Sequence, residues 1–261
     1  MSGRPNLYSP RQIELIRDSG RIVAECLEIV RKMVAPGVTT RQLDQAIADH
    51  IAKSGGRSPF KGYELPGKVP FPASVCASVN DVVVHGLPDD KPLKNGDLVS
   101  IDVGCYKNGY IGDSAWTFAV GEPDEGAQKL MAAGVDSLYA GIAAMKPKGL
   151  LAEASRAVQT LVEGRGFTVV RDYVGHGVGQ SLHEEPQVRN YVEAKDWIPG
   201  FRTVLKPGMV LAIEPMVNEG GPKVQGDAVQ WPVRTEDGGR SVHFEHTVAI
   251  LPDRIEILTK L

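Results

Sequence analysis

The stretch that decides the fold is LVSIDVGCYKNGYIGDSAWTFAV, residues 98–120, which predicts two strands joined by a tight turn. Asn108-Gly109 is a strong hairpin signal because both central residues of a type I′ turn need positive φ. Counting back in step from this turn places Asp102 and Asp113 diagonally on one face, roughly 7–8 Å apart at the backbone. The stretch therefore predicts a hairpin that carries two neighbouring carboxylates.

Two carboxylates on one face of a hairpin have two interpretations. Unpaired, Asp102 and Asp113 would repel each other and raise each other's pKa, so a bound cation is the natural third partner. The alternative is a pair of solvent-facing aspartates, which is favoured for an isolated pair at this spacing. The rest of the chain has to decide between them.

Length and composition predict an ordinary globular protein. The chain has 261 residues, 42% of them hydrophobic, enough for one large domain or two small ones. A net charge of −3 and a pI near 6.1 argue against a general nucleic-acid binder. We find no apolar leader and no run of about 18 apolar residues, so we expect neither a signal peptide nor a membrane span. Three cysteines without a C-x-x-C pair suit a reducing compartment, and we expect a cytoplasmic protein.

Two helices are predicted before the hairpin. SPRQ at 9–12 is a capping box, and apolar residues then recur at three- and four-residue steps until Pro36-Gly37. A second helix begins at Thr39 and ends at Gly55-Gly56. A loop and two short strands are expected to follow, at 59–72, 73–78 and 82–85.

The same order of elements begins again after Glu122-Pro123, which indicates an internal repeat. Helices are expected at 126–145 and 151–163, and LKPGMVLAIEP at 205–215 echoes LKNGDLVSIDV at 93–103. Three pairs of landmarks share an offset of 112 residues: Gly37 and Gly149, Lys94 and Lys206, Asp102 and Glu214. We therefore predict a single domain, 1–261, whose related halves span about 9–121 and 122–261.

The repeat supplies two further acids. Glu214 is the counterpart of Asp102, on a strand whose other face is apolar, and Glu245 lies in the alternating strand-like stretch 242–250. Four carboxylates at a pseudo-twofold axis cannot stay charged without cations. No Arg or Lys stands beside Asp102, Glu214 or Glu245 in the sequence, so a metal site is favoured over an ion-paired cluster.

Three of the six histidines lie where a side chain can reach a cleft. His85 follows a predicted strand, His176 lies in a glycine-flanked turn, and His183 follows it by seven residues. A lone histidine near an apolar strand is more often a core residue, so these positions favour function without deciding it.

Five segments carry a family resemblance: VHGLPDD (84–90), SIDVGCYKNGYIGDSAWTF (100–118), GHGVGQSLHEEP (175–186), AIEPMV (212–217) and FEHTV (244–248). Together, over nearly the whole chain, they resemble the short bacterial form of the type I methionine aminopeptidases, enzymes that remove the initiator methionine. The resemblance implies the pita-bread fold. This is an α/β (α+β) architecture in which a pseudo-twofold repeat of two helix-and-strand halves surrounds a central curved antiparallel sheet.

The resemblance also implies two divalent metal ions, from Co, Mn, Fe or Zn. Asp102 and Asp113 would bind one ion. The other ion would be bound by four residues, of which Asp113 and Glu245 would bridge the two ions. That second set is Asp113, His176, Glu214 and Glu245. Such a pair of ions holds a bridging hydroxide against the scissile carbonyl.

Three side chains acquire catalytic roles from the resemblance. Glu214 would accept or shuttle a proton as well as bind metal. His183 would stabilise the oxyanion, and His85 would contact the scissile amide or assist the leaving amine.

The resemblance implies a methionine pocket and a monovalent-cation site. The pocket would be formed by Tyr63, Phe71, Cys76, His85 and Trp231, with Phe60 and Leu182 beside them. Singly, each of these residues is explained as readily by core packing. Residues 64–70 depart from the short pattern as an insertion at the pocket lip. The backbone carbonyls of Asn80, Val82 and Ser241 match the monovalent-cation site.

The implied substrate is a nascent polypeptide or peptide with an N-terminal Met and a small second residue, and the ribosome is an expected partner of a monomeric enzyme. Two alternatives stay open. An X-Pro aminopeptidase or prolidase usually carries an additional N-terminal domain of the order of a hundred residues or more. A metal-free binding protein on the same fold is disfavoured because all five ligand positions are intact.

Overall fold

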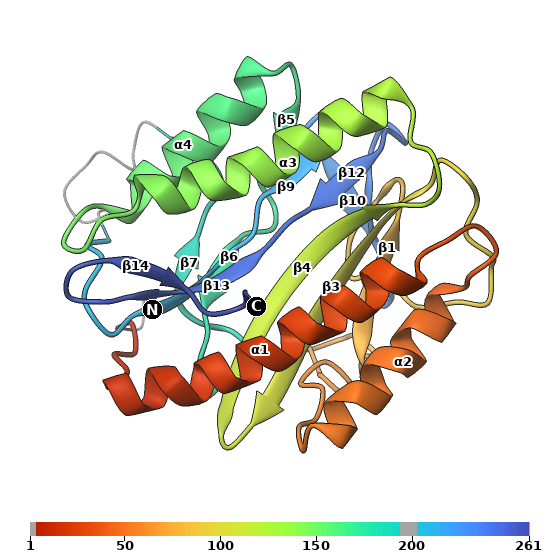
Figure 1. The fold of residues 1–261 in the computed structure, drawn as a ribbon. Helices are drawn as coiled ribbons and strands as arrows, with labels where there is room; N and C mark the ends of the chain where they lie inside the picture. Colours follow the sequence, from red (N-terminus) through yellow and green to blue (C-terminus); the bar gives the residue numbers. More distant parts are fainter. Residues whose placement is uncertain (1–3, 194–202, 261) are drawn as a thin grey trace.

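The computed structural model describes residues 4–193 and 203–260. This part of the chain contains four helices and fourteen strands, and the strands pair with one another in antiparallel orientation (Figure 1). The helices are α1 (Pro10–Met33), α2 (Thr40–Lys53), α3 (Glu125–Ala144) and α4 (Leu151–Gly164). The strands are β1 (Val75–Val79), β2 (Val82–Val84), β3 (Leu98–Lys107), β4 (Tyr110–Ala119), β5 (Thr168–Val169), β6 (Gly175–Gly177), β7 (Glu184–Val188), β8 (Val210–Ile213), β9 (Met216–Asn218), β10 (Val224–Gly226), β11 (Val233–Thr235), β12 (Ser241–His243), β13 (His246–Ile250) and β14 (Ile255–Ile257).

The β3–β4 hairpin has the predicted register. Asn108 and Gly109 have φ values of 51° and 87°, as a type I′ turn requires. Asp102 lies opposite Ala115 and Gly104 lies opposite Asp113, without a bulge along the ladder. The turn therefore determines which side chains share each face of these two strands.

Side-chain caps define where the first two helices begin. Ser9 and Thr39 each accept a hydrogen bond from the backbone N–H three residues on, and the glutamine there bonds back to the capping residue's N–H. Both boxes satisfy N–H groups that have no partner inside the helix. The predicted starts of α1 and α2 are confirmed.

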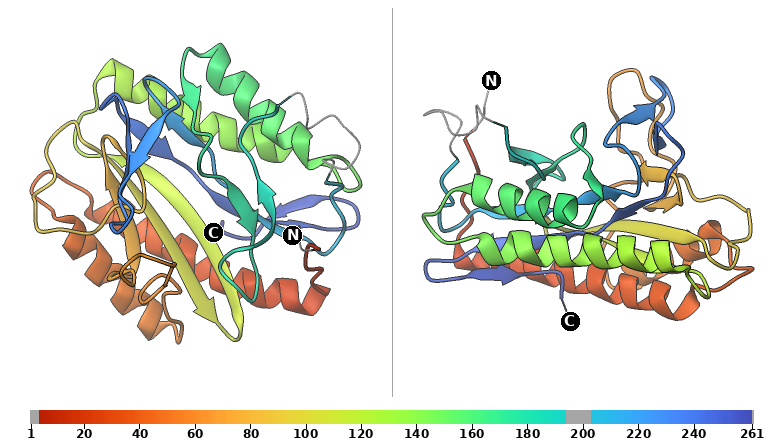
Figure 2. Two further views of the ribbon diagram at one scale, coloured as in Figure 1. Left: turned by 180° about the vertical axis from the view of Figure 1, so that it is seen from behind. Right: turned by 90° about the horizontal axis from the view of Figure 1, so that it is seen from above.

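Two helix pairs each cover part of the sheet structure. Figure 2 shows the helices gathered on one side of the strands, with β10 and β11 projecting from the other side. Side chains of α1 and α2 pack with those of β1 and β3 in one apolar core, and α3 and α4 pack with β8, β12 and β13 in another. Trp116 of β4 contacts both cores.

The second half builds its strands differently from the hairpin. Glu214 was predicted on a strand, but β8 ends at Ile213 and β9 begins at Met216. Glu245 likewise lies in a gap, between β12 and β13. Both strand predictions are therefore wrong at these residues. Pro215 has no N–H to donate to a ladder, and here β12 pairs with β9 whereas β13 pairs with β8.

Threonine side chains join β4 to these split strands. The Thr247 hydroxyl donates to the Asp113 carbonyl (2.7 Å) and accepts from the Asp113 N–H (3.1 Å). Thr117 makes the same two bonds to His243, both at 2.9 Å. Between them, the Glu245 N–H donates to the Ala115 carbonyl at 2.8 Å. This seam, defined as Thr117, Thr247 and the Glu245–Ala115 bond, aligns Asp113 with Glu245.

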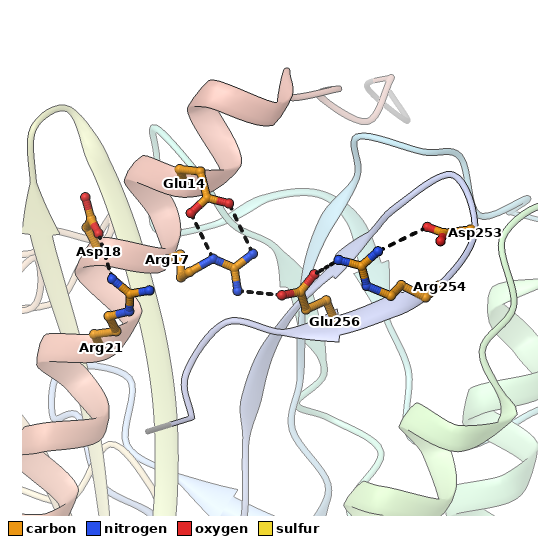
Figure 3. A network of polar contacts seen from close by, with 7 residues as sticks. All are labelled: Glu14, Arg17, Asp18, Arg21, Asp253, Arg254 and Glu256. Carbon is orange, nitrogen blue, oxygen red and sulfur yellow. Dashed lines mark hydrogen bonds and ion pairs between the residues drawn. The ribbon is translucent and has the colours of Figure 1, made fainter.

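An ion-pair network on the outer surface joins the first helix to the last strand (Figure 3). Arg17 of α1 contacts Glu14 at 3.1 Å and Glu256 of β14 at 2.8 Å. Arg254 pairs with the second oxygen of Glu256 at 2.9 Å. Single surface pairs contribute about 0–1 kcal/mol, but shared partners make this arrangement a network rather than one pair.

Among the described residues, no helix combines the length and the apolar character needed to cross a membrane.

Candidate metal centre

One cavity of about 200 Å³ receives the predicted metal-binding and catalytic side chains. They come from the hairpin, from β6 and the loop after it, from the loop after β2, and from the gaps in the split strands. The side chains are Asp102, Asp113, His176, Glu214, Glu245, His85 and His183. The fold thus gathers these residues from five separate parts of the sequence.

The most compact group in the cavity contains Asp113, His176 and Glu245. One ligand atom from each lies within 4.8 Å of the others, and all three side chains are buried. Glu214 lies beside this group, with its Oε1 3.4 Å from His176 Nε2. Two acids, an imidazole and a neighbouring acid form a set of oxygen and nitrogen ligands suited to a divalent transition metal.

The orientation of His176 follows from the close packing of β6. A Cβ atom at Gly175 or Gly177 would overlap a backbone carbonyl of a neighbouring segment, so only glycine fits on either side. The His176 Nδ1–H donates to the Gly177 carbonyl at 2.9 Å, which leaves the Nε2 lone pair facing Asp113 and Glu214. Burial lowers the pKa of His176 to about 3, so the ring is neutral at pH 7.

The four carboxyls are not neutralised by protein cations. Burial raises the pKa of Asp102 to about 7 and that of Glu214 to about 8. It also raises the pKa values of Asp113 and Glu245 well above the usual range, and neighbouring carboxylates add to both shifts. No Lys or Arg is among the described residues that line the cavity.

Several buried atoms of these residues lack partners. Asp102 Oδ1, Asp113 Oδ1 and Glu245 Oε1 have no hydrogen-bond partner among the described residues. Unpaired buried oxygens of this kind are costly, and a cation would satisfy both the charge and the lone pairs. The side chains therefore fit a metal centre. An ion-paired cluster would need a Lys or Arg side chain, and none is among the described residues that line the cavity.

His183 lies at the edge of the centre, next to His176. Their ring centroids are 4.4 Å apart, and the Tyr63 hydroxyl is 2.8 Å from His183 Nδ1. Burial lowers the pKa of His183. A neutral imidazole that accepts a hydrogen bond from the tyrosine hydroxyl at Nδ1 carries its own hydrogen on Nε2. That Nε2–H can donate a hydrogen bond to a substrate.

His85 adopts an unusual backbone conformation directly after β2. Its φ is 58°, a left-handed value that costs about 1–3 kcal/mol in a residue other than glycine. The ring packs edge-on against Tyr173 and Trp231, and burial lowers its pKa to about 4. Backbone strain at a cavity wall is typical of residues positioned for function.

Aromatic side chains form the apolar wall of the cavity. The predicted pocket residues Tyr63, Phe71, Cys76 and Trp231 all line it, as do Phe60 and Leu182. Trp231 lies 5.3 Å from Phe71 and 6.4 Å from Tyr63 between ring centroids. This wall meets the metal centre directly, so an apolar side chain bound here would place its backbone beside the carboxylates.

Residues 64–70, the predicted insertion, form part of the cavity rim. Leu65 lines the cavity and is 38% exposed. Trp231 Nε1 donates to the Val69 carbonyl at 2.8 Å, and the Lys68 ammonium donates to the carbonyls of Asp227 and Gln230. The insertion is thereby tied to the segment that carries Trp231.

The three residues predicted to bind a monovalent cation lie outside this cavity. Asn80 and Ser241 are adjacent, since the Ser241 N–H donates to the Asn80 carbonyl at 2.9 Å, and Val82 begins β2 two residues later.

His243 and Tyr173, which were not predicted from the sequence, also line the cavity. His243 stands two residues before Glu245, and strand alternation would have indicated a shared face. Tyr173 precedes the glycine-flanked His176 segment and had no comparable signal.

Comparisons with known proteins give consistent matches over nearly the whole chain. The sequence profile of Metallopeptidase family M24 matches residues 14–252. "Methionine aminopeptidase 1" of Bacillus subtilis is 47% identical over 253 residues, which cover 97% of this chain and 98% of that protein. The crystal structure of methionine aminopeptidase from Thermotoga maritima has a TM-score of 0.92 at 42% identity and covers 99% of this chain and 100% of its own.

A more distant structural match is the prolidase from Pyrococcus furiosus, with a TM-score of 0.74 at 24% identity. The match covers 98% of this chain and 65% of the prolidase, and at this identity it indicates a shared fold alone. The predicted α/β pita-bread fold is confirmed by these structural neighbours.

Proposed function

The chain belongs to metallopeptidase family M24, and we propose that it is a metal-dependent aminopeptidase that removes the initiator methionine from nascent proteins and peptides. The observation that carries the proposal is one cavity that joins an apolar aromatic wall to five side chains of metal-binding type. The wall suits a methionine side chain, because thioether sulfur makes favourable contacts with aromatic rings.

An X-Pro peptidase is the second candidate that the fold permits. The prolidase match is weaker in both identity and TM-score than the match to the Thermotoga maritima aminopeptidase. We therefore retain methionine removal, and we use X-Pro peptides as the competing substrate in the test below.

We assign two divalent ions, from Co, Mn, Fe or Zn, to the centre. Asp102 and Asp113 would hold one, and His176, Glu214, Asp113 and Glu245 the other, with Asp113 and Glu245 bridging. Divalent ions in such a pair supply Lewis acidity and lower the pKa of water towards neutrality. The orphaned carboxylate oxygens and the Nε2 lone pair of His176 support this assignment.

Glu214 would hold the proton released as water attacks the scissile carbonyl. Its carboxylate lies 3.4 Å from His176 Nε2, so a proton taken up there would stay beside the reacting atoms and could be passed to the leaving amine. Because Glu214 also faces His176, the same side chain would orient the ligand set.

His183 and His85 would act on the two ends of the scissile bond. With Tyr63 donating to Nδ1, His183 Nε2–H is available to stabilise the developing oxyanion. His85, held in a strained conformation against Trp231, would contact the amide or the departing amine.

The apolar wall would bind the methionine side chain through Tyr63, Phe71, Cys76 and Trp231, with Phe60 and Leu182 beside them. The rim segment 64–70 would contact the bound substrate, because Leu65 lines the cavity. The family resemblance implies a small residue after the methionine.

We further propose a single catalytic domain built from two related halves, monomeric, cytoplasmic and working at the ribosome on emerging chains. Three buried cysteines without disulfide partners support a reducing compartment. The carbonyls of Asn80, Val82 and Ser241 would hold one monovalent cation, which the adjacency of Asn80 and Ser241 supports.

The test measures cleavage of Met-Ala-Ser against an X-Pro tripeptide by protein stripped of metal and then reloaded with Mn²⁺ or Co²⁺. We expect the stripped protein to be inactive and the reloaded protein to release methionine. Glu214→Ala should keep the fold and lose about 10²- to 10⁴-fold in turnover. Preference for X-Pro, or wild-type rates in Glu214→Ala, would refute the proposal. Lys129→Ala, which removes an exposed side chain paired with Glu125 on α3, provides a control outside the cavity.

A further inference from the structure

His243 is the buried cavity residue whose role is unassigned. It ends β12, two residues before Glu245, and its side chain is 3% exposed. Its backbone is fixed by the two Thr117 bonds of the seam. Its Nε2 nevertheless has no hydrogen-bond partner among the described residues, although it lies in a cavity lined by four carboxyls. A buried ring nitrogen without a hydrogen-bond partner is unfavourable, and a bound metal ion would satisfy it.

Glu214 stands between two imidazoles. Its Oε1 is 3.4 Å from His176 Nε2, and its Oε2 is 3.4 Å from His243 Nε2. Both distances exceed those of good N–H···O hydrogen bonds, about 2.7–3.2 Å. Two ligand atoms that each lie about 2.1 Å from one tetrahedral ion are about 3.4 Å apart. Both contacts therefore have the separation of atoms that share a metal ion.

The two imidazoles serve different acids of the hairpin. His176 Nε2 lies 3.9 Å from Asp113 Oδ2, whereas His243 ends β12, which packs against β3, the strand that carries Asp102. The centre thus has one ring nitrogen on the Asp113 side and one on the Asp102 side.

We propose that His243 is a sixth metal-binding side chain, which binds the ion on the Asp102 side as His176 binds the ion on the Asp113 side. This inference rests on the proposed metal-dependent function. It places Glu214 between the two rings, with Oε1 facing His176 and Oε2 facing His243. Imidazole favours Fe, Zn, Cu and Ni over the harder ions that carboxylates suit, so His243 would bias the Asp102 position away from Mn²⁺.

The experiment compares wild-type protein with His243→Gln, which keeps a hydrogen-bond donor but is a poor metal ligand. Metal-free protein is titrated with Co²⁺ under equilibrium dialysis, and the visible absorption of Co²⁺ is recorded. We expect two ions in the wild type, and in His243→Gln a second ion bound about 10- to 100-fold more weakly. The Asp102 position should also lose part of its preference for Co²⁺ over Mn²⁺.

His50→Gln is the matched control, because His50 pairs with Glu25 on the outer helices, away from the centre. Its Co²⁺ titration should match the wild type. X-ray absorption on wild-type protein loaded with two Co²⁺ then counts imidazoles directly, without relying on a variant that folds. Two imidazoles per pair of ions support the proposal, and one imidazole overturns it.

The proposal is also overturned if folded His243→Gln binds its second Co²⁺ ion as tightly as the wild type does. The glutamine amide can replace an imidazole that only donates a hydrogen bond, but it cannot replace one that binds metal. Cleavage of Met-Ala-Ser is measured on the same samples. Methionine release with unchanged Co²⁺ binding in His243→Gln refutes the assignment of His243 alone. Two bound ions and two imidazoles without methionine release refute the proposed function and leave the metal-binding role of His243 standing.

Discussion

The two acids of the β3–β4 hairpin and the two acids of the split strands reach the same cavity by different means. The hairpin is an unbroken ladder from Leu98 opposite Ala119 to Lys107 opposite Tyr110. Glu214 and Glu245 lie where strands stop, in gaps aligned by pairing with other strands and by the seam. A local turn can place the first pair of acids, whereas only assembled tertiary structure places the second.

The largest difference should appear within the hairpin, when each aspartate is removed in turn. Asp113 belongs to the compact group with His176 and Glu245, and Asp102 does not. Asp113→Ala should therefore weaken metal binding at least about tenfold more than Asp102→Ala. Calorimetric titration with Mn²⁺ measures both affinities. Equal losses, or a larger loss in Asp102→Ala, would contradict the bridging role of Asp113.

A second prediction tests whether the seam holds the two regions together. Thr247→Val removes a hydroxyl that bonds both the N–H and the carbonyl of Asp113. Leaving these buried groups unpaired should lower the free energy of unfolding by about 1–3 kcal/mol. Urea denaturation of metal-free protein measures the loss. Thr160→Val, on an exposed position of α4, is the matched control, and a similar small effect in both variants would show that the seam is dispensable.

A third prediction tests the local specification of the hairpin. Gly109 has a φ of 87° with open space around it, so Gly109→Ala adds backbone strain without a clash. We expect a loss of about 1–2 kcal/mol in unfolding free energy. Gly164→Ala, at the last position of α4, also meets open space but has no left-handed φ, and it should be neutral or slightly stabilising. If both variants behave alike, the turn conformation does not contribute.

The smallest effect concerns an ion pair beside the split strands. Arg240 contacts Glu219 at 2.7 Å and the α3 cap Asp124 at 2.8 Å, and it lowers the pKa of Glu219 below the ordinary 4.5. A lowered folded-state pKa stabilises the fold above pH 4.5, and this contribution is lost as pH falls through the folded-state value.

The stability difference between wild type and Arg240→Gln should therefore be largest above pH 4.5 and shrink on acidification. Urea denaturation across this range measures it, and subtracting the two proteins cancels the titration of the cavity carboxyls. Arg31→Gln, which removes an exposed pair with Glu28 on α1, should have a smaller effect. A difference that does not change with pH would exclude the Glu219 ion pair as its source.

The parts of the fold that the sequence predicted correctly are those with strong local signals. The capping boxes at Ser9 and Thr39 and the turn at Asn108-Gly109 depend on residues within a few positions of one another, so their geometry could be predicted directly. The end of the strand before Glu214 could not be predicted in this way. Apolar and polar residues continue to alternate through this position even though the strands on either side of it pair with different partners. Pro215 was the available warning.

The sequence by itself determined the residue types of the site, the hairpin register and, through the repeat, which distant acids correspond to one another. Only the tertiary structure decided that β12 and β13 pair with different strands, that Thr117 and Thr247 align β4 with them, and that His243 faces Glu214. The physical reason is range. A turn is specified by the conformational preferences of adjacent residues, whereas buried charges and lone pairs acquire partners only when segments far apart in the chain have packed together.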